Sequence, residues 1–224
     1  MKRMIITTTH GDEQFSVPVV ESLKQQFEFE WLTGNPLATQ RGVRFIEADL
    51  NRVGPGKLKS ELYEEVRAYE VIKMASKFDE VIDIHGTISD SGIFSILSDP
   101  NWSNIELSKK IDVPRVVLWP SLQPRGPLTQ FIPNSLEIEC GPKNAKHTLI
   151  ELERILSAYL GYKKPVGEKE YFIVSGILKC SVSTPLKDFA KEKYKGDSFY
   201  PLMVDQYPGI KCYMLQKLGA TLAY

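Results

Sequence analysis

The sequence has few cysteines, no excess of either charge and no long apolar run. Its three cysteines, Cys140, Cys180 and Cys212, are widely spaced and form no C-x-x-C pair. They indicate neither a zinc ribbon nor a disulfide framework, and they favour free thiols in a reducing cytoplasm. The 28 basic and 28 acidic side chains cancel, so a general nucleic-acid-binding surface is not expected. The apolar stretch at residues 4–6 is too short for a signal peptide, and no stretch reaches the ~20 apolar residues of a membrane span. We therefore expect a cytoplasmic protein with no nucleic-acid or membrane partner.

Strand and helix patterns alternate through residues 1–163. Buried or alternating strands are predicted at 4–9, 27–32, 80–84, 115–119 and 136–140, and helices at 18–27, 60–78 and 146–160. On the helix at 60–78 the spacing predicts an apolar face of Leu62, Val66, Tyr69, Ile72 and Ala75 or Ser76. This alternation predicts an α/β fold, with a mixed, largely parallel sheet flanked by helices. Strand patterns at 170–182, 199–204 and 210–215, separated by turn residues, predict a small β-rich C-terminal subdomain over 164–224.

Metal-binding residue types follow two of the predicted strands. His10 and Glu13 form an H-x-x-E pair after the first strand, and His85 ends a later one. Because ligands collect outside the carboxyl ends of parallel strands, we expect these three side chains to converge on one zinc ion. Asp83 is expected to orient one of the histidines from behind. An H-x-x-E pair alone occurs by chance on protein surfaces, and a histidine alone after a strand usually has a structural role. The prediction of a metal site therefore depends on the expected convergence of all three residues.

A third segment offers a carboxylate for chemistry. Glu137 and Glu139 lie two residues apart in a predicted strand, so both point to the same face, while Cys140 points to the other. A carboxylate beside an activated water can act as general base and then as general acid. The alternative is a half-exposed strand with two solvated glutamates. Trp102 and Trp119 are expected in the core, with pocket lining as the alternative.

Five short segments together resemble the succinylglutamate desuccinylase/aspartoacylase family, a branch of the zinc carboxypeptidase-like hydrolases. Their order and spacing match over about the first two-thirds of the chain. The segments are Thr8-Thr9-His10-Gly11-Asp12-Glu13, Asn35-Pro36-Leu37-Ala38, Arg44 through Arg52, Asp83-Ile84-His85 and Ile138-Glu139-Cys140-Gly141-Pro142.

The resemblance implies a role for each matching residue. His10, Glu13 and His85 would bind one zinc ion, and Glu139 would activate the water. Arg44 would polarise the scissile carbonyl, and Asn51 and Arg52 would hold a substrate carboxylate. The implied reaction is hydrolysis of the amide bond of a small N-acyl amino acid. The resemblance also allows a homo-oligomer.

Some positions depart from the family pattern and leave the substrate open. Asp12 stands where asparagine is usual and adds a negative charge, and Gly86 stands where aspartoacylases usually carry asparagine. Thr129 stands where aspartoacylases carry an arginine for the acidic substrate side chain, and Arg125 is out of register; both count against N-acetylaspartate. The substrate-contacting tyrosine of the C-terminal part is either Tyr207 or Tyr213.

Two other functions remain open from the sequence. A zinc carboxypeptidase acting on a small peptide would use the same residues but needs an open groove, whereas an N-acyl amino acid deacylase needs a narrow pocket. A binding protein without catalysis would be indicated by loss of a metal ligand or of Glu139, but the sequence retains all of them.

Overall fold

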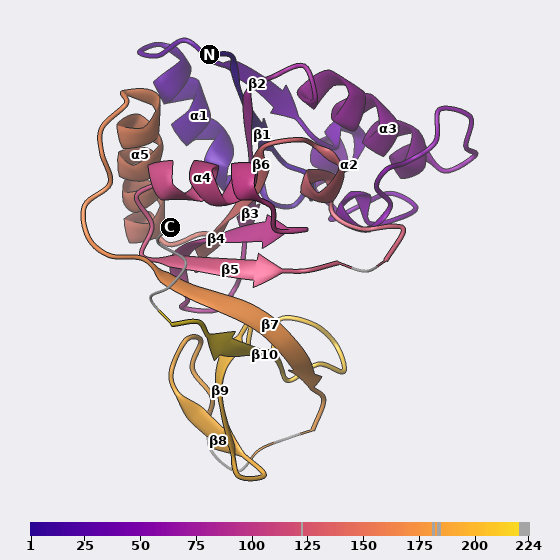
Figure 1. Cartoon of the computed structure of the whole chain (residues 1–224). Coiled ribbons are helices and arrows are strands. Elements are labelled where there is room, and N and C mark those ends of the chain that lie inside the picture. The colour runs from indigo at the N-terminus through magenta and orange to yellow at the C-terminus, as the bar shows by residue number, and fades with distance from the viewer. Residues whose placement is uncertain (122, 181, 183–184, 220–224) are drawn as a thin grey trace.

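The computed structural model describes residues 1–121, 123–180, 182 and 185–219, and within them ten strands form one sheet (Figure 1). The strand order is β2-β1-β3-β6-β4-β5-β7-β10-β9-β8. The strands are β1 (Arg3–Thr7), β2 (Glu30–Thr33), β3 (Glu80–Gly86), β4 (Gly92–Ser98), β5 (Arg115–Trp119), β6 (Ser135–Gly141), β7 (Glu170–Leu178), β8 (Glu192–Tyr194), β9 (Asp197–Leu202) and β10 (Cys212–Lys217).

The sheet is mixed, as predicted. Strands β2, β1, β3 and β6 pair in parallel, and so do β4, β5 and β7. The β6–β4 pair is antiparallel, as are the pairs that join β7, β10, β9 and β8. The parallel block brings the carboxyl ends of β1, β3 and β6 to one edge, which is where the predicted site residues lie.

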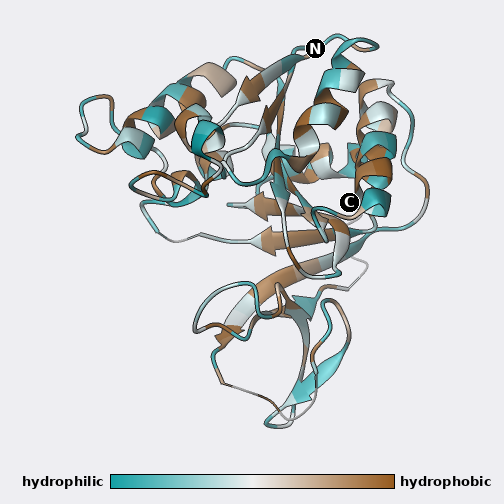
Figure 2. Cartoon of the chain, turned by 180° about the vertical axis from the view of Figure 1, so that it is seen from behind, coloured by the Kyte–Doolittle hydropathy of each residue, from teal (hydrophilic) through white to brown (hydrophobic). Residues whose placement is uncertain are grey.

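Helices cover both faces of the parallel part. On one face, α1 (Val17–Lys24), α4 (Trp102–Lys110) and α5 (Lys146–Leu160) bury their apolar residues against the sheet. On the other face, α3 (Tyr63–Ala75) packs with the short helices η2 (Leu50–Arg52) and η3 (Leu128–Phe131). The remaining short helices are α2 (Pro36–Arg41) and η1 (Gln14–Ser16). In Figure 2 the central strands are mostly hydrophobic, whereas the helices alternate hydrophobic and hydrophilic turns. Within the described residues, no helix is both long and apolar enough to cross a membrane.

The structure contains elements that the sequence pattern did not reveal, namely β4, α2, α4 and β8. The predicted apolar face of the helix at 60–78 was partly right. Ala75 is fully buried and Ile72 packs against the same cluster, as predicted. Leu62 precedes the helix and is exposed, and the buried Ala68 and Val71 were not predicted. Glu64 is also buried, because its carboxylate accepts hydrogen bonds from the backbone N–H groups of residues 46–48. Both this capping contact with the loop and the apolar face of Ala68, Val71 and Ala75 therefore hold α3 in its orientation.

The C-terminal strands extend the main sheet. Strand β7 pairs in parallel with β5, and the second face of β4 and β5 packs against the C-terminal part through Phe94, Ile96, Val117, Phe172 and Leu202. The predicted strand at 170–182 ends at Leu178, and its residue 181 lies outside the described residues. The boundary at residue 163 stays a prediction. This packing closes one side of the space in front of β6.

Candidate active site

The turn after β1 aims two side chains at one point. The Glu13 N–H donates to the His10 carbonyl at 3.0 Å, which brings the two residues onto the same side of the turn. The Gly11 N–H donates to the Arg44 carbonyl at 3.0 Å and ties the turn to the following loop. A Cβ on Gly11 would lie 2.2 Å from the backbone carbon of Ala38, so only glycine allows this close approach to α2.

His10, Glu13 and His85 form a buried cluster at the ends of β1 and β3. Glu13 Oε1 lies 3.1 Å from His10 Nδ1, and Glu13 Oε2 lies 3.4 Å from His85 Nδ1. The two Nδ1 atoms are 3.3 Å apart. One donor atom from each residue lies within 4.8 Å of the others, so these residues could hold a metal ion. The sequence-predicted ligands are therefore brought together.

The far nitrogens of both imidazole rings are held by carboxylates. His85 Nε2 lies 3.0 Å from Asp83 Oδ2, and Asp83 in turn accepts a hydrogen bond from the Thr9 hydroxyl. His10 Nε2 lies 3.0 Å from Asp49 Oδ1. Such partners fix the ring so that the other nitrogen faces the metal position. Asp83 was predicted in this role, whereas Asp49 was not; its only signal was its place between Arg44 and Arg52.

The Glu13 carboxylate supplies the negative charge that a divalent cation needs, whereas each histidine must lose its proton to bind one. Burial disfavours the Glu13 carboxylate, but hydrogen bonds from His10 and His85 outweigh it and hold the Glu13 pKa well below its usual range. Burial likewise opposes protonation of His10, but its hydrogen bonds to Asp49 and Glu13 raise the pKa. One carboxylate and two imidazoles with converging Nδ1 atoms are the donor set of a catalytic zinc site. The residues present therefore fit the metal that the family resemblance implies.

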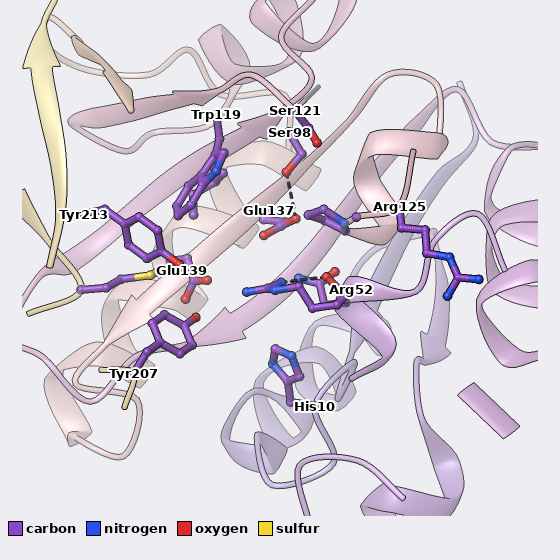
Figure 3. Close-up of a pocket in the computed structure, with 15 residues that line it drawn as sticks. His10, Arg52, Ser98, Trp119, Ser121, Arg125, Glu137, Glu139, Tyr207 and Tyr213 are labelled. Carbon is purple, nitrogen blue, oxygen red and sulfur yellow. Dashed lines mark hydrogen bonds between the residues drawn. The ribbon is translucent and has the colours of Figure 1, made fainter. Parts of the chain in front are cut away.

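A cavity of about 270 Å³ opens beside this cluster, and Figure 3 shows side chains from both halves of the chain around it. It is lined by His10, Asn51, Arg52, Ile96, Ser98, Trp119, Ser121, Arg125, Gly126, Pro127, Glu137, Glu139, Met203, Tyr207 and Tyr213. Its mixture of aromatic, charged and polar walls is typical of a small-molecule site.

Strand β6 presents Glu137 and Glu139 to the cavity and Cys140 to the opposite core, as the alternation predicted. Glu139 stands directly opposite His85 in the parallel β3–β6 register. Burial, followed by the charges of Glu13 and Glu137, raises the pKa of Glu139 to about 7, although the imidazoles of His85 and His10 oppose the rise. A carboxyl that titrates near neutrality can both accept and release a proton.

Of the candidate residues in the segment after α2, two line the cavity and one does not. Asn51 and Arg52 line it, and the Asn51 side-chain oxygen accepts the Leu128 N–H at 3.1 Å. Arg44 is not among the lining residues. Its guanidinium donates to Asp49 Oδ2 at 3.0 and 3.1 Å and lies 3.8 Å from Glu13 Oε1. Arg44 therefore contacts the back of the ligand cluster.

The structure also shows the surroundings of residues that depart from the family pattern or whose role was left open. Asp12 pairs with Lys143 at 3.3 Å and is not part of the ligand cluster. Thr129 donates its hydroxyl to Glu137 at 2.7 Å. Both Tyr207 and Tyr213 line the cavity, so the structure does not select one of them. Trp119 also lines it, whereas Trp102 is exposed, which makes the expectation of a core position wrong for Trp102.

Comparison with known proteins shows the family to which the chain belongs. The family model described as the succinylglutamate desuccinylase/aspartoacylase catalytic domain matches residues 2–142, which is more than half of the chain. The chain belongs to this family. The matched region contains all three members of the ligand cluster together with Glu139, and the match confirms the resemblance identified from the sequence segments.

Individual relatives agree with the family. A probable aspartoacylase of Prochlorococcus marinus subsp. pastoris is 28% identical over 156 residues, covering 62% of this chain and 53% of that protein. An N-acyl-aromatic-L-amino acid amidohydrolase (carboxylate-forming) of Xenopus tropicalis is 32% identical over 112 residues, covering 42% of this chain and 36% of that protein. The matches therefore span about half or less of the length of these relatives.

Solved structures share the fold over nearly the whole chain. Murine aminoacylase 3 superposes with a TM-score of 0.76 at 17% identity, covering 97% of this chain and 95% of that one. The succinylglutamate desuccinylase of Chromobacterium violaceum gives a TM-score of 0.73 at 16% identity, covering 98% and 85%. The C-terminal strands beyond residue 142 thus belong to the same architecture.

Proposed function

We propose that this protein is a zinc-dependent amidohydrolase that cleaves the amide bond of a small N-acyl amino acid, giving a carboxylate and a free amine. The observation that carries the proposal is a shared cavity: His10, from the metal-binding cluster, and Glu139, a carboxyl that titrates near neutrality, line the same space. Membership of the deacylase family and the relatives that act on N-acyl amino acids support it.

His10, Glu13 and His85 are the proposed ligands, one metal per chain. A zinc ion supplies Lewis acidity, which polarises a carbonyl oxygen and makes water easier to deprotonate. Asp49 and Asp83 hold the two imidazoles in the orientation in which Nδ1 faces the ion. Because Glu13 is buried, its negative charge is poorly screened by solvent and favours a bound dication, whereas the two histidines would bind it as neutral imidazoles.

Glu139 is the proposed proton carrier. As a carboxylate it accepts a proton from the attacking water, and it then returns that proton to the nitrogen of the departing amine. Its raised pKa suits both steps at neutral pH. No other carboxyl that lines the cavity stands directly opposite a proposed ligand in the β3–β6 register, within the described residues.

The arginines divide into two roles. Arg52, with Asn51, lines the cavity and is proposed to bind the substrate α-carboxylate, because a guanidinium matches a carboxylate with two parallel hydrogen bonds. Arg44 is proposed to stabilise the negative charge that develops on the scissile carbonyl. In the structure Arg44 is paired with Asp49, so this role requires its guanidinium to turn toward the substrate.

The size of the cavity bears on the alternative of a carboxypeptidase. A volume of about 270 Å³ lies just below the usual range of about 300–1,000 Å³ for small-molecule sites, which suits one acylated amino acid better than a peptide. We therefore place the deacylase first.

The direct test compares the zinc-loaded wild type with Glu139→Gln on a panel of N-acetyl amino acids. We expect kcat to fall about 10²- to 10⁴-fold, the usual contribution of a general acid–base, while zinc content stays at one per chain. The control Glu153→Gln removes an exposed carboxylate on α5 and should leave kcat unchanged. Equal rates for wild type and Glu139→Gln would refute the assignment, and cleavage of peptides without cleavage of N-acetyl amino acids would favour the peptidase.

A further inference from the structure

Glu137 is a buried carboxylate in the cavity that the proposed hydrolysis does not use. Its side chain is 4% exposed, and it faces the cavity two residues before Glu139 on β6. The hydroxyl groups of Ser98 and Thr129 both donate to its Oε1 atom, at 3.2 and 2.7 Å. The bond from Ser98 is drawn in Figure 3. Glu137 is therefore held in place by two neighbours and does not swing freely.

Within the described residues Glu137 forms no close ion pair, although its charge favours the cationic forms of the nearby Arg52 and His85. Among the residues that the structure describes, no lysine, arginine or histidine forms an ion pair with it, and both recorded hydrogen bonds end at Oε1. Arg52 shares the cavity, but its Nη1 donates to the Asn51 carbonyl at 2.7 Å. A buried carboxylate is costly unless a positive charge or several donors meet it. Oε2 is thus available for a donor brought by a ligand.

Aromatic rings stand in the same cavity. Trp119 and Tyr213 meet edge to face, with ring centroids 4.5 Å apart, and Tyr207 lies 6.1 Å from Tyr213. In Figure 3 the Trp119 and Tyr213 side chains lie near Glu139, and Glu137 lies further toward the centre of the view. An aromatic face attracts an ammonium group, and the attraction grows where water is excluded. A carboxylate and aromatic walls together form a site for an organic cation.

Arg125 is not positioned to bind an acidic side chain of the substrate. Its guanidinium pairs with Glu65 Oε1 at 2.8 Å, and its side chain is 52% exposed. In Figure 3 it extends away from Glu137 and Glu139. Arg52 also lines the cavity, and we assign it to the substrate α-carboxylate. An acidic side chain placed against Glu137 would be repelled by its like charge.

We propose that the cavity selects N-acyl amino acids whose side chain ends in an ammonium group, which Glu137 binds beside the Trp119–Tyr213 wall, and that it rejects acidic side chains. The selection in hydrolysis rests on the proposed deacylase function. The binding preference rests only on the cavity and can be tested without catalysis.

The first test compares three substrates of similar length with the zinc-loaded wild type: Nα-acetyl-ornithine, Nα-acetyl-norleucine and Nα-acetyl-glutamate. Norleucine carries a methyl group where ornithine carries its ammonium. A hydrogen bond to a charged group predicts a kcat/KM about ten- to hundredfold higher for the ornithine derivative than for the norleucine derivative. The glutamate derivative should be the poorest of the three. Equal values, or a preference for glutamate, would overturn the proposal.

The variant Glu137→Gln tests whether the Glu137 carboxylate causes the preference for ornithine over norleucine. Glutamine keeps an oxygen for Ser98 and Thr129 but loses the charge, so the ornithine-to-norleucine ratio should fall toward one. Glu153→Gln, on the exposed side of α5, should keep the wild-type ratio. An unchanged ratio in Glu137→Gln would show that another group selects the substrate. If that variant does not fold, the wild-type comparison decides.

A calorimetric titration separates this proposal from the deacylase function. Free L-ornithine, L-norleucine and L-glutamate are titrated into the zinc-loaded wild type, and ornithine should bind at least tenfold more tightly than either of the others. That result without hydrolysis of any amide would refute the deacylase and keep the cation site. Hydrolysis without a preference for ornithine in either assay would keep the deacylase and refute the cation site.

Discussion

Gly11 offers the sharpest test of how the fold builds the metal site. A Cβ at this position would lie 2.2 Å from Ala38 C and 2.4 Å from Thr39 N. Both contacts are backbone atoms of α2, so no side-chain rotation can relieve them. In Gly11→Ala the turn must move by more than 1 Å to restore a contact of ordinary length. Metal ligands tolerate about 0.2 Å, so the variant cannot hold His10 and Glu13 in place together.

We expect Gly11→Ala to bind zinc at least tenfold more weakly than wild type, measured by competition with a chromophoric chelator. Overpacking should also cost about 1–3 kcal/mol of stability, which lowers Tm by about 2–4 °C for each kcal/mol in a chain of this size. The matched control is Gly176→Ala in β7, where the nearest atom to the new Cβ is Met214 Sδ at 4.0 Å. Zinc affinity within twofold of wild type in Gly11→Ala would refute this account of the turn.

Three further predictions concern the proton carrier, the ligand support and the core. Because burial raises the pKa of Glu139 to about 7 and a bound dication lowers it, kcat/KM should rise with pH to a plateau, with an apparent pKa at or below about 7; a limb centred above 8 would contradict this. Asp83→Asn should weaken zinc binding about 10- to 100-fold in chelator competition, and unaltered affinity would exclude its role in orienting His85. Phe94→Ala should cost about 3–5 kcal/mol in denaturant unfolding, because Phe94 is fully buried against Phe189; a loss under 1 kcal/mol would be inconsistent with that packing.

The fold was predictable where burial is periodic or continuous. The segments that became β1, β3 and β6 are short, with apolar residues that are continuous in β1 and alternate with polar ones in β3 and β6, so these strands could be placed. Strand β4 was not found, because its apolar run is interrupted by Ser95, which is buried in the sheet despite its hydroxyl. The buried face of α3 was only partly predicted: Ala75 was expected there, but the burial of Glu64 depends on backbone donors of the loop at residues 46–48.

The site was predictable to the extent that its residues share short motifs. His10, Glu13 and His85 follow strand ends and converge as expected. Asp49 could not be assigned, because its contact with His10 depends on the loop that Gly11 ties to Arg44. The setting of Glu137 was equally hidden, since its partner Ser98 lies 39 residues earlier on a strand that the sequence did not reveal.

The central claim is that His10, Glu13 and His85 hold one catalytic zinc ion beside Glu139. The most direct measurement is anomalous diffraction at the zinc edge from crystals of the zinc-loaded protein. The account predicts one peak per chain, about 2.0–2.2 Å from His10 Nδ1, His85 Nδ1 and a Glu13 carboxylate oxygen. A folded protein with no peak at this position, or with its only peak elsewhere, would contradict it.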